Sequence, residues 1–297
     1  MAKPPTTVIL VNTGGGSAGD DARGKVTAAL RGAGIAGEVE LLDGGELVDR
    51  ATQAVKERAP LIIAAGGDGT QSAVAGAVAG SDSVMGVLPL GTLNHLARDL
   101  GISFDLGEAA QVIAAGKVHA IDVAELNGRV FVNNSAIGLY PLMVEDREAQ
   151  QDHLGRPKKL ATIVAGLRTL ARFHHYRLSI TVNDARKATV DTPLLFVGNN
   201  DYRLEMPRVG CRDALDQRRL SVVLLRKQGR LAFFRSLLRA MAGRSRASDL
   251  IRLDDVQRLR VTSRRSRIMV ALDGETIEQP PKLDYRIRPG ALKVMVP

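Results

Sequence analysis

The sequence has little cysteine and few aromatic residues: its 297 residues include one Cys, no Trp, six Phe and four Tyr. A single cysteine, Cys211, excludes an internal disulfide framework and fits a reducing compartment. Because aromatic side chains provide the platforms on which unpaired bases stack, their scarcity argues against a protein that binds single-stranded nucleic acid.

Long hydrophobic runs are also missing. No stretch reaches the roughly 18 apolar residues that a membrane-spanning helix needs. The first residues, MAKPPTTVILVN, contain one Lys and only a short apolar run before a glycine-rich turn. That pattern is poor for a signal peptide and favours a first buried strand. We therefore expect a cytoplasmic protein.

Charge separates the two halves of the chain. Residues 1–150 hold 11 basic and 18 acidic side chains, whereas residues 151–297 hold 30 and 14. The length favours one large or two medium domains. An acidic front half and a basic back half indicate two units with different functions, and the basic unit is expected to contact an anionic surface.

The front half alternates apolar strand patterns with helical patterns. Predicted strands are TVILVN (7–12), VELL (39–42), LIIAAGG (61–67) and VMGVLPLG (84–91), and helices are expected at about 20–30, 46–59, 72–80 and 93–100. Strands that alternate with helices indicate a parallel, doubly wound sheet.

After about residue 117 the pattern changes to short, alternating, β-rich runs, among them RVFVNNSAIG (129–138), and each run is expected to form one strand. Asn-Gly at 127–128 and Asp-Gly at 273–274 are tight-turn signals between such runs. Two basic helical patterns interrupt them, at 158–176 and 230–244. The back half is therefore predicted to be an antiparallel β-sandwich, joined to the front half by a linker near 117–127.

The predicted fold class is thus α/β, with an N-terminal doubly wound parallel-sheet domain over 1–123 and a C-terminal antiparallel β-sandwich domain over 124–289. The last run, within 290–297, could return to the first domain as a further strand.

GGDGT (66–70) lies directly after a buried strand and directly before a helix. Glycines let backbone N–H groups approach a phosphate, and the helix N-terminus adds a favourable dipole. A carboxylate beside a polyphosphate makes sense when a divalent cation lies between them, so Asp68 indicates a metal–phosphate site. The alternative is a tight turn in which Asp68 caps the helix that begins near Gln71. The candidate ligand-binding residues of this turn are Gly66, Gly67, Asp68, Gly69 and Thr70.

PLGTLNHLARDLG (89–101) repeats this arrangement one strand later. Loops at the carboxyl ends of neighbouring parallel strands converge on one crevice, so Gly91 and Thr92 are expected to face the same ligand as GGDGT. Asn94 could hydrogen-bond a phosphate or a sugar, or it could cap the following helix.

These motifs together resemble a known family. GGDGT, PLGTLNHLARDLGI at 89–102 and LDGE at 272–275 are similar, in this order, to the diacylglycerol kinase catalytic-domain family, particularly its bacterial lipid kinases. NNSAIGLYP (133–141) and FVGNN (196–200) also fit, so the resemblance covers nearly the whole chain. It implies a nucleotide domain like those of phosphofructokinases and NAD kinases. The implied activity is phosphoryl transfer from Mg-ATP to a lipid hydroxyl, with ATP bound between the two domains.

The resemblance also implies roles for single residues. Asn12 matches the family's early Asn motif, and Thr70 and Thr92 would contact phosphates. Asp68 and Asp122 would hold Mg²⁺ through water. Glu275 matches the proposed general base, with Asp273 beside it, so Glu275, Asp273 and Asp68 are the catalytic residues that the resemblance implies.

The chain departs from the family pattern at three places. His95 stands where many members have Asp, which removes one carboxylate from the metal–water network. Thr13 replaces a Pro in the first loop. A Leu-Asp-Asp-Gly loop that supplies a structural metal site in some members reads Leu215-Asp216-Gln217-Arg218 here, which leaves Asp216 as the remaining acidic ligand.

Other functions stay open at this point. The acceptor could be a sphingoid base, ceramide or NAD instead of a diacylglycerol-like lipid, or the protein could be a catalytically silent nucleotide- or lipid-binding protein. Nucleic-acid binding, which the basic back half suggests and for which RRSR at 264–267 is the best feature, is not expected. The basic helix over 230–246 and its counterpart at 158–176 predict peripheral contact with an anionic membrane at its inner face. Edge strands of the sandwich could pair in a homodimer.

Overall fold

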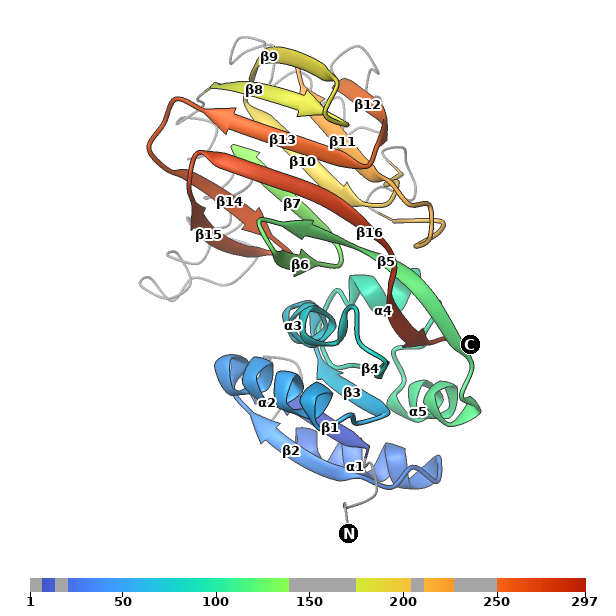
Figure 1. Cartoon of the computed structure of the whole chain (residues 1–297). Helices are drawn as coiled ribbons and strands as arrows, with labels where there is room; N and C mark the ends of the chain where they lie inside the picture. The colour runs from blue at the N-terminus through green and yellow to red at the C-terminus, as the bar shows by residue number, and fades with distance from the viewer. Residues whose placement is uncertain (1–6, 14–20, 139–174, 204–210, 227–249) are drawn as a thin grey trace.

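The chain folds into a layered α/β unit and a β-sandwich that share one sheet (Figure 1). The computed structural model describes residues 7–13, 21–138, 175–203, 211–226 and 250–297. The α/β unit contains, in order, β1 (Val8–Asn12), α1 (Ala22–Gly32), β2 (Glu38–Leu42), α2 (Gly44–Lys56), β3 (Leu61–Gly66), α3 (Asp68–Val78), β4 (Val84–Pro89), α4 (His95–Asp99) and α5 (Leu106–Ala115).

Strands β2, β1, β3 and β4 are parallel neighbours in that order. Helix α1 packs against α5, and α2 packs against α3, so helices cover both faces of the sheet. Strands buried on both faces must be apolar throughout, which explains the continuous runs VILV and IIAA. The arrangement confirms the predicted doubly wound fold.

The sandwich is built from two sheets. Its strands are β5 (Val118–Leu126), β6 (Arg129–Phe131), β7 (Asn134–Gly138), β8 (Tyr176–Val182), β9 (Arg186–Thr192), β10 (Leu194–Asn199), β11 (Leu220–Leu225), β12 (Leu250–Val256), β13 (Arg258–Ser263), β14 (Ile268–Leu272), β15 (Glu275–Gln279) and β16 (Lys282–Met295). Among the described residues, one sheet has the order β12-β11-β10-β7-β14-β15, and the other continues the parallel sheet through β16, β13, β8 and β9. This confirms the predicted antiparallel sandwich.

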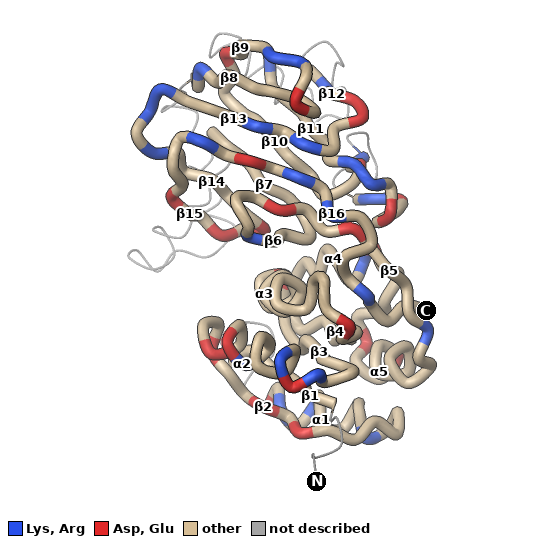
Figure 2. Tube along the Cα trace, in the orientation of Figure 1, with Lys and Arg blue, Asp and Glu red and all other residues tan. Residues whose placement is uncertain are grey.

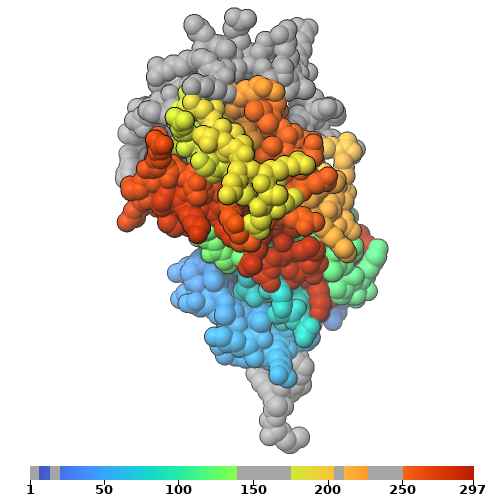
Figure 3. All heavy atoms as spheres, turned by 45° about the horizontal axis from the view of Figure 1, so that its top comes forward, coloured from blue at the N-terminus to red at the C-terminus, as the bar shows by residue number. Residues whose placement is uncertain are grey.

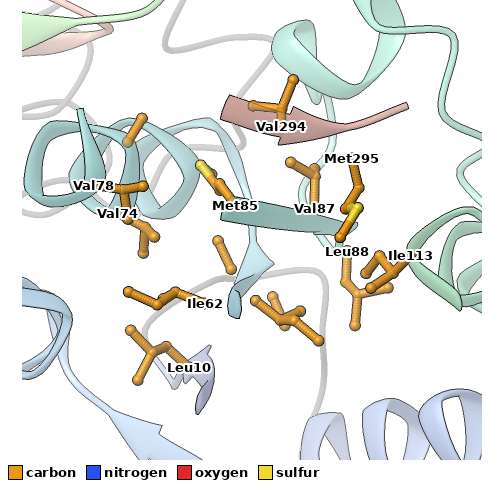
Figure 4. Close-up of a cluster of buried hydrophobic side chains, with 14 of the residues drawn as sticks. Leu10, Ile62, Val74, Val78, Met85, Val87, Leu88, Ile113, Val294 and Met295 are labelled. Carbon is orange, nitrogen blue, oxygen red and sulfur yellow. The ribbon is translucent and has the colours of Figure 1, made fainter. Parts of the chain in front are cut away.

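Strand β16 passes from one unit into the other. Its first half pairs antiparallel with β13 over Lys282–Arg286, and its second half pairs parallel with β4 at Lys293 and Val294. The return of the last run to the first domain, which the sequence leaves open, is therefore observed. Figure 4 shows Val294 and Met295 among Val87, Leu88 and Ile113 in the buried core of the α/β unit.

In the part of the chain that the structure describes, the buried apolar side chains form two clusters. Along β5, Val123 belongs to the cluster of the α/β unit and Ala124 to that of the sandwich. The predicted linker near 117–127 is not a loop, because β5 crosses from one unit to the other as a strand paired with β16. In the space-filling view of Figure 3 the two units lie against each other, with the first helices and strands below the sheet strands β8, β13 and β16.

Two hairpins follow the tight-turn signals of the sequence. Asn127 and Gly128 both have positive φ, 49° and 90°, between β5 and β6. Asp273 and Gly274 do the same, at 47° and 93°, between β14 and β15. Two central residues with positive φ make the type I′ geometry that the Asn-Gly and Asp-Gly pairs favour.

Two sequence-based boundaries were wrong. Tyr176 begins β8, so the helix predicted over 158–176 does not reach its last residue. The run RVFVNNSAIG, expected to be one strand, is split into β6 and β7 because the chain turns at Val132 and Asn133. The remainder of that helix and the helix at 230–246 lie outside the described residues.

Basic and acidic residues lie near one another along the strands of the shared sheet (Figure 2). Arg258 pairs with Asp284, Arg260 with Asp184, and Arg286 with Glu125. These ion pairs offset part of the positive charge of these strands. Within the described residues, no helix is long and apolar enough to cross a membrane.

Candidate active site

The two glycine loops touch each other at the carboxyl ends of β3 and β4. The Leu90 N–H donates to the Gly66 carbonyl at 3.0 Å. A Cβ built on Gly91 would lie only 2.5 Å from the Cα of Gly67. The two backbones therefore approach too closely for residue 91 to carry a side chain. The structure thus brings together the two loops that the sequence predicts to face one ligand.

Gly91→Ala is expected to force these loops apart, because the nearest obstacle is backbone that cannot rotate away. Overpacking of this kind costs about 1–3 kcal/mol, and we expect a lower Tm together with weaker binding of a fluorescent ATP analogue. Gly32→Ala in α1 is the matched control, since a Cβ at that position would meet no atom within 4 Å. A Gly91→Ala protein with unchanged Tm and nucleotide affinity would contradict the tight contact.

Thr70 is buried and holds the first loop to β1. The Asn12 side-chain amide donates to the Thr70 hydroxyl at 2.9 Å. A Cβ on Gly66 would lie 2.3 Å from the same hydroxyl oxygen, so a glycine is required there. The three predicted ligand-binding residues Asn12, Gly66 and Thr70 are therefore adjacent, although in this arrangement Thr70 bonds Asn12.

Asp68 joins the two loops. It is the first residue of α3, and its Oδ1 accepts the backbone N–H of His95 at 2.6 Å. Gly67, not Asp68, occupies the cap position, so the alternative role of Asp68 as a helix cap is wrong. Because the contact uses the backbone of residue 95, it does not depend on the His95 side chain, which lies 2.8 Å from the Arg98 guanidinium.

Asn94 closes its own loop. Its side-chain oxygen accepts from the Gly91 N–H at 3.0 Å, and its amide donates to the Gly91 carbonyl at 2.7 Å. Asn94 has φ 46°, and its side chain makes no capping bond to α4. The side chain thus shapes the second loop, and contact of Asn94 or the exposed Thr92 with a ligand stays a prediction.

Asp273 lies in the turn of the β14–β15 hairpin and binds this hairpin to neighbouring segments. Its carboxylate accepts the N–H groups of Val132, Asn133 and Asn134 at 2.8, 2.9 and 2.9 Å, and it also accepts the hydroxyl of Ser72 in α3. Burial raises the pKa of the Asp273 carboxyl, and these hydrogen bonds oppose that rise. The hairpin is thereby fixed to the α/β unit and to the β6–β7 turn.

Glu275, the next acidic residue of this hairpin, faces the first glycine loop. A Cβ on Gly69 would lie 4.0 Å from the Glu275 Oε1. Its other oxygen pairs with Arg129 at 2.8 Å, and about 61% of its side chain is exposed. Glu275 is therefore accessible to a ligand that lies over the GGDGT loop.

A cleft of about 530 Å³ opens between the two units at this point. Its walls come from α2, α3, the β5–β6 turn and the β14–β15 hairpin. Polar residues that line it are Asn12, Thr70, Ser72, Arg129, Asp273 and Glu275. The cleft thus contains the first loop and the predicted base together.

Asp122 and Asp216 have different surroundings. Asp122 is buried in β5, where one carboxylate oxygen accepts from Gly290 N–H at 2.9 Å and the other from Arg218 N–H at 2.6 Å. Asp216 is exposed and lies 3.8 Å from the His119 ring. Both oxygens of Asp122 are used by backbone donors, so its geometry fits a brace between β5 and β16 better than a metal ligand.

The residues fit a Mg²⁺ ion that arrives with a nucleotide. Among the described residues, no group of three or more His, Cys, Asp or Glu is placed to hold a metal ion. Mg²⁺, however, is commonly bound by one or two carboxylates with phosphates and waters as its other ligands. Asp68 engages only Oδ1 with a described residue, which leaves Oδ2 to accept from a water of such an ion.

Sequence reasoning missed Ser72 and Arg129. Ser72 lies four residues after Asp68, so helix periodicity places it on the same side of α3 as Asp68. Arg129 directly follows the Asn-Gly turn, as Glu275 follows the Asp-Gly turn. Arg129 could therefore have been predicted by its equivalence to Glu275.

The fold and the paired loops define a two-unit protein with a doubly wound α/β unit and an antiparallel β-sandwich on either side of a cleft. Residues 5–126 match the diacylglycerol kinase catalytic domain, and residues 143–296 match the YegS C-terminal NAD kinase beta sandwich-like domain. The chain therefore belongs to the diacylglycerol kinase catalytic-domain family, in the branch that carries the YegS-type C-terminal domain.

Individual relatives cover parts of the chain. The probable lipid kinase YegS-like protein of Enterobacter sp. (strain 638) is 34% identical over 146 residues, 46% of this chain and 47% of its own length. A diacylglycerol kinase of Bacillus subtilis (strain 168) is 44% identical over 90 residues, 28% and 30% of the two chains. The chain spans about half the length, or less, of these curated relatives.

Two solved structures share the fold over nearly the whole chain. A diacylglycerol kinase from Bacillus anthracis str. Sterne superimposes with a TM-score of 0.69 at 18% identity, covering 99% of this chain and 97% of its own. An NAD kinase from Archaeoglobus fulgidus in complex with ATP gives 0.53 at 10% identity, covering 97% and 93%. At these identities the likeness concerns the fold alone.

Proposed function

We propose that this protein is an ATP-dependent lipid kinase that transfers the γ-phosphoryl group of ATP to a hydroxyl of a diacylglycerol-like lipid. The observation that carries the proposal is the position of Glu275 beside Gly69 in the wall of the cleft, where a carboxylate lies next to a glycine turn at a helix N-terminus. Relatives named as diacylglycerol kinases and lipid kinases support the same activity.

The reaction asks for positioning, charge neutralisation and a proton acceptor. The lipid hydroxyl oxygen attacks the γ-phosphorus, and the bond from that phosphorus to the bridging oxygen of ADP breaks. The hydroxyl proton passes to the Glu275 carboxylate as the new bond forms. General-base help of this kind typically contributes about 10²–10⁴-fold to the rate.

The remaining residues bind and orient. Backbone N–H groups of Gly67 and Gly69 would face the phosphates, since glycine allows the closest approach. Asp68 would hold Mg²⁺ through water, and the ion supplies neutralisation of charge on the transferring phosphoryl group. Asp273 keeps the Glu275 hairpin at a fixed distance from α3.

The identity of the acceptor is tested by incubating the protein with Mg²⁺, radiolabelled ATP and a panel of acceptors, followed by thin-layer chromatography. The panel contains diacylglycerol, monoacylglycerol, ceramide, sphingosine, phosphatidylglycerol and NAD. Labelled phosphatidic acid is the expected product. A labelled dinucleotide alone would identify an NAD kinase, and nucleotide binding without any labelled product would identify a silent binding protein.

Access to such an acceptor requires contact with a lipid surface. We propose peripheral binding to the anionic inner face of the membrane, supported by the excess of basic residues after residue 150. Cosedimentation with vesicles should therefore increase with their phosphatidylglycerol content, and binding that ignores this content would refute the proposal.

A further inference from the structure

Arg212 is a buried arginine that the site described above does not use. Its side chain is 0% exposed, and that of its partner Asp99 is 2% exposed. A buried charge is costly unless it is paired and fully hydrogen-bonded. Its retention in the interior therefore calls for a role that a hydrophobic residue could not fill.

All three guanidinium nitrogens of Arg212 donate hydrogen bonds. Nε donates to the Asp99 carboxylate at 2.7 Å, at the end of α4. Nη1 donates to the carbonyls of Val132 at 2.5 Å and Asn199 at 3.2 Å, and Nη2 donates to the Asn133 side chain at 3.0 Å. The planar fork of arginine is thus matched to acceptors from both structural units.

The ring of Tyr202 covers one face of the guanidinium, with 5.2 Å between its centre and the guanidinium carbon. Burial raises the pKa of the Tyr202 hydroxyl to about 12, so the ring beside the charge is neutral. This contact shields the Arg212 charge from solvent on that side.

The β6–β7 turn lies between Arg212 and Asp273. The guanidinium bonds the carbonyl of Val132 and the side chain of Asn133. On the other side, the Asp273 carboxylate accepts the N–H groups of Val132, Asn133 and Asn134. The position of the β14–β15 hairpin, which carries Asp273 and Glu275, therefore depends on the β6–β7 turn, and Arg212 fixes that turn by hydrogen bonds.

Helix α4 connects the same arginine to the phosphate loops. Its first residue, His95, donates its N–H to Asp68, and its last residue, Asp99, accepts from Arg212. A continuous path of contacts thus runs from Asp68 through α4 and Arg212 to the turn that binds Asp273. Each link is a hydrogen bond or a helical segment of five residues.

We propose that Arg212 is a positioning residue that fixes the distance between the Asp68 loop and the Asp273–Glu275 hairpin. This inference rests on the proposed function of that site. Replacing buried ion pairs by apolar residues is often neutral for stability, so stability alone does not explain why the pair is present. A role in aligning the reacting groups explains the presence of the pair, because a displacement of about 1 Å can lower the rate about 10²-fold.

The test compares Arg212→Lys with Asp99→Asn in the full chain. Lysine keeps the positive charge but lacks the planar guanidinium group, so it cannot bond the Val132 carbonyl and the Asn133 side chain at the same time. We expect kcat to fall about 10²-fold for Arg212→Lys and less for Asp99→Asn, with KM for ATP nearly unchanged in both. Circular dichroism below the Tm establishes that each variant is folded.

Hydrogen–deuterium exchange supplies a readout that does not need activity. In Arg212→Lys the amides of residues 132–134 should exchange faster, while those of β1, β3 and β4 keep their protection. Arg203→Met is the matched control, because Arg203 forms an exposed pair with Asp213 in the neighbouring segment. It should leave both kcat and exchange at wild-type values.

Wild-type kcat in folded Arg212→Lys, or a faster exchange spread evenly over the protein, would overturn the positioning role. If the wild-type protein phosphorylates no acceptor, the proposed function fails, whereas the exchange at residues 132–134 still decides whether Arg212 holds the turn.

Discussion

Asp68→Asn is expected to reduce ATP-dependent lipid phosphorylation about 10²–10³-fold, the size of effect seen when one electrostatic stabiliser of a transition state is removed. Asparagine keeps a side-chain oxygen that can accept the His95 N–H, so the link between the loops persists. The substitution removes the negative charge on which the proposed contact with a Mg²⁺-bound water would depend. Initial rates with radiolabelled ATP measure the loss, and the Tm should change little.

A second variant of Asp68 and a control separate the effect of the charge from that of the hydrogen bond. Asp68→Ala removes both and should also lower the Tm, because the His95 N–H loses its acceptor. Asp82→Asn is the matched control, since Asp82 is fully exposed and pairs only with Lys293 among the described residues. A rate for Asp68→Asn close to that of Asp82→Asn would remove Asp68 from the site.

Glu275→Gln is the second large effect that we expect, with a fall in kcat of about 10²–10⁴-fold. Glutamine has nearly the same shape but cannot accept the hydroxyl proton. The lost pair with Arg129 is solvent-exposed and contributes at most about 1 kcal/mol, so the fold should persist. Nucleotide affinity, measured by titration of a fluorescent ATP analogue, should remain within a few-fold of wild type because the base acts only in the chemical step.

Glu278→Gln controls for the loss of an acidic residue from the same hairpin. Glu278 lies three residues further along β15 and pairs with exposed Arg267. It should keep full activity. Near wild-type turnover of Glu275→Gln would show that the lipid hydroxyl loses its proton elsewhere and would remove the feature on which the proposed function rests.

Local sequence signals predicted the elements that build the cleft. GGDGT and PLGTLNH each follow an apolar strand, and parallel strands bring their carboxyl ends together, so the meeting of Gly67 with Gly91 follows from topology. Asn-Gly and Asp-Gly specified both hairpins because few other pairs adopt positive φ twice.

Other parts of the molecule carry weaker or purely long-range signals. Helix α5 was not predicted, although Asp105 caps its N-terminus and Gly116 ends it in the left-handed conformation. Asp273 was expected beside the catalytic base as a reacting group, and the sequence could not show that its carboxylate binds three N–H groups about 140 residues away. Arg212 likewise resembles any surface arginine until Asp99, 113 residues away, is placed against it.

The course of β16 has a consequence for how the molecule is made. Asp82 and Lys293 form an ion pair across 211 residues of chain, and the edge of β4 that faces away from β3 is paired only when β16 is present. During synthesis, β1 to β4 leave the ribosome long before β16, so the nascent α/β unit carries an open sheet edge while the sandwich strands emerge. Edges of this kind attract wrong partners, and contacts so distant in sequence form slowly. Completion of the nucleotide half should therefore be a late event in biogenesis, and a chain cut before residue 282 should not leave a properly folded first half.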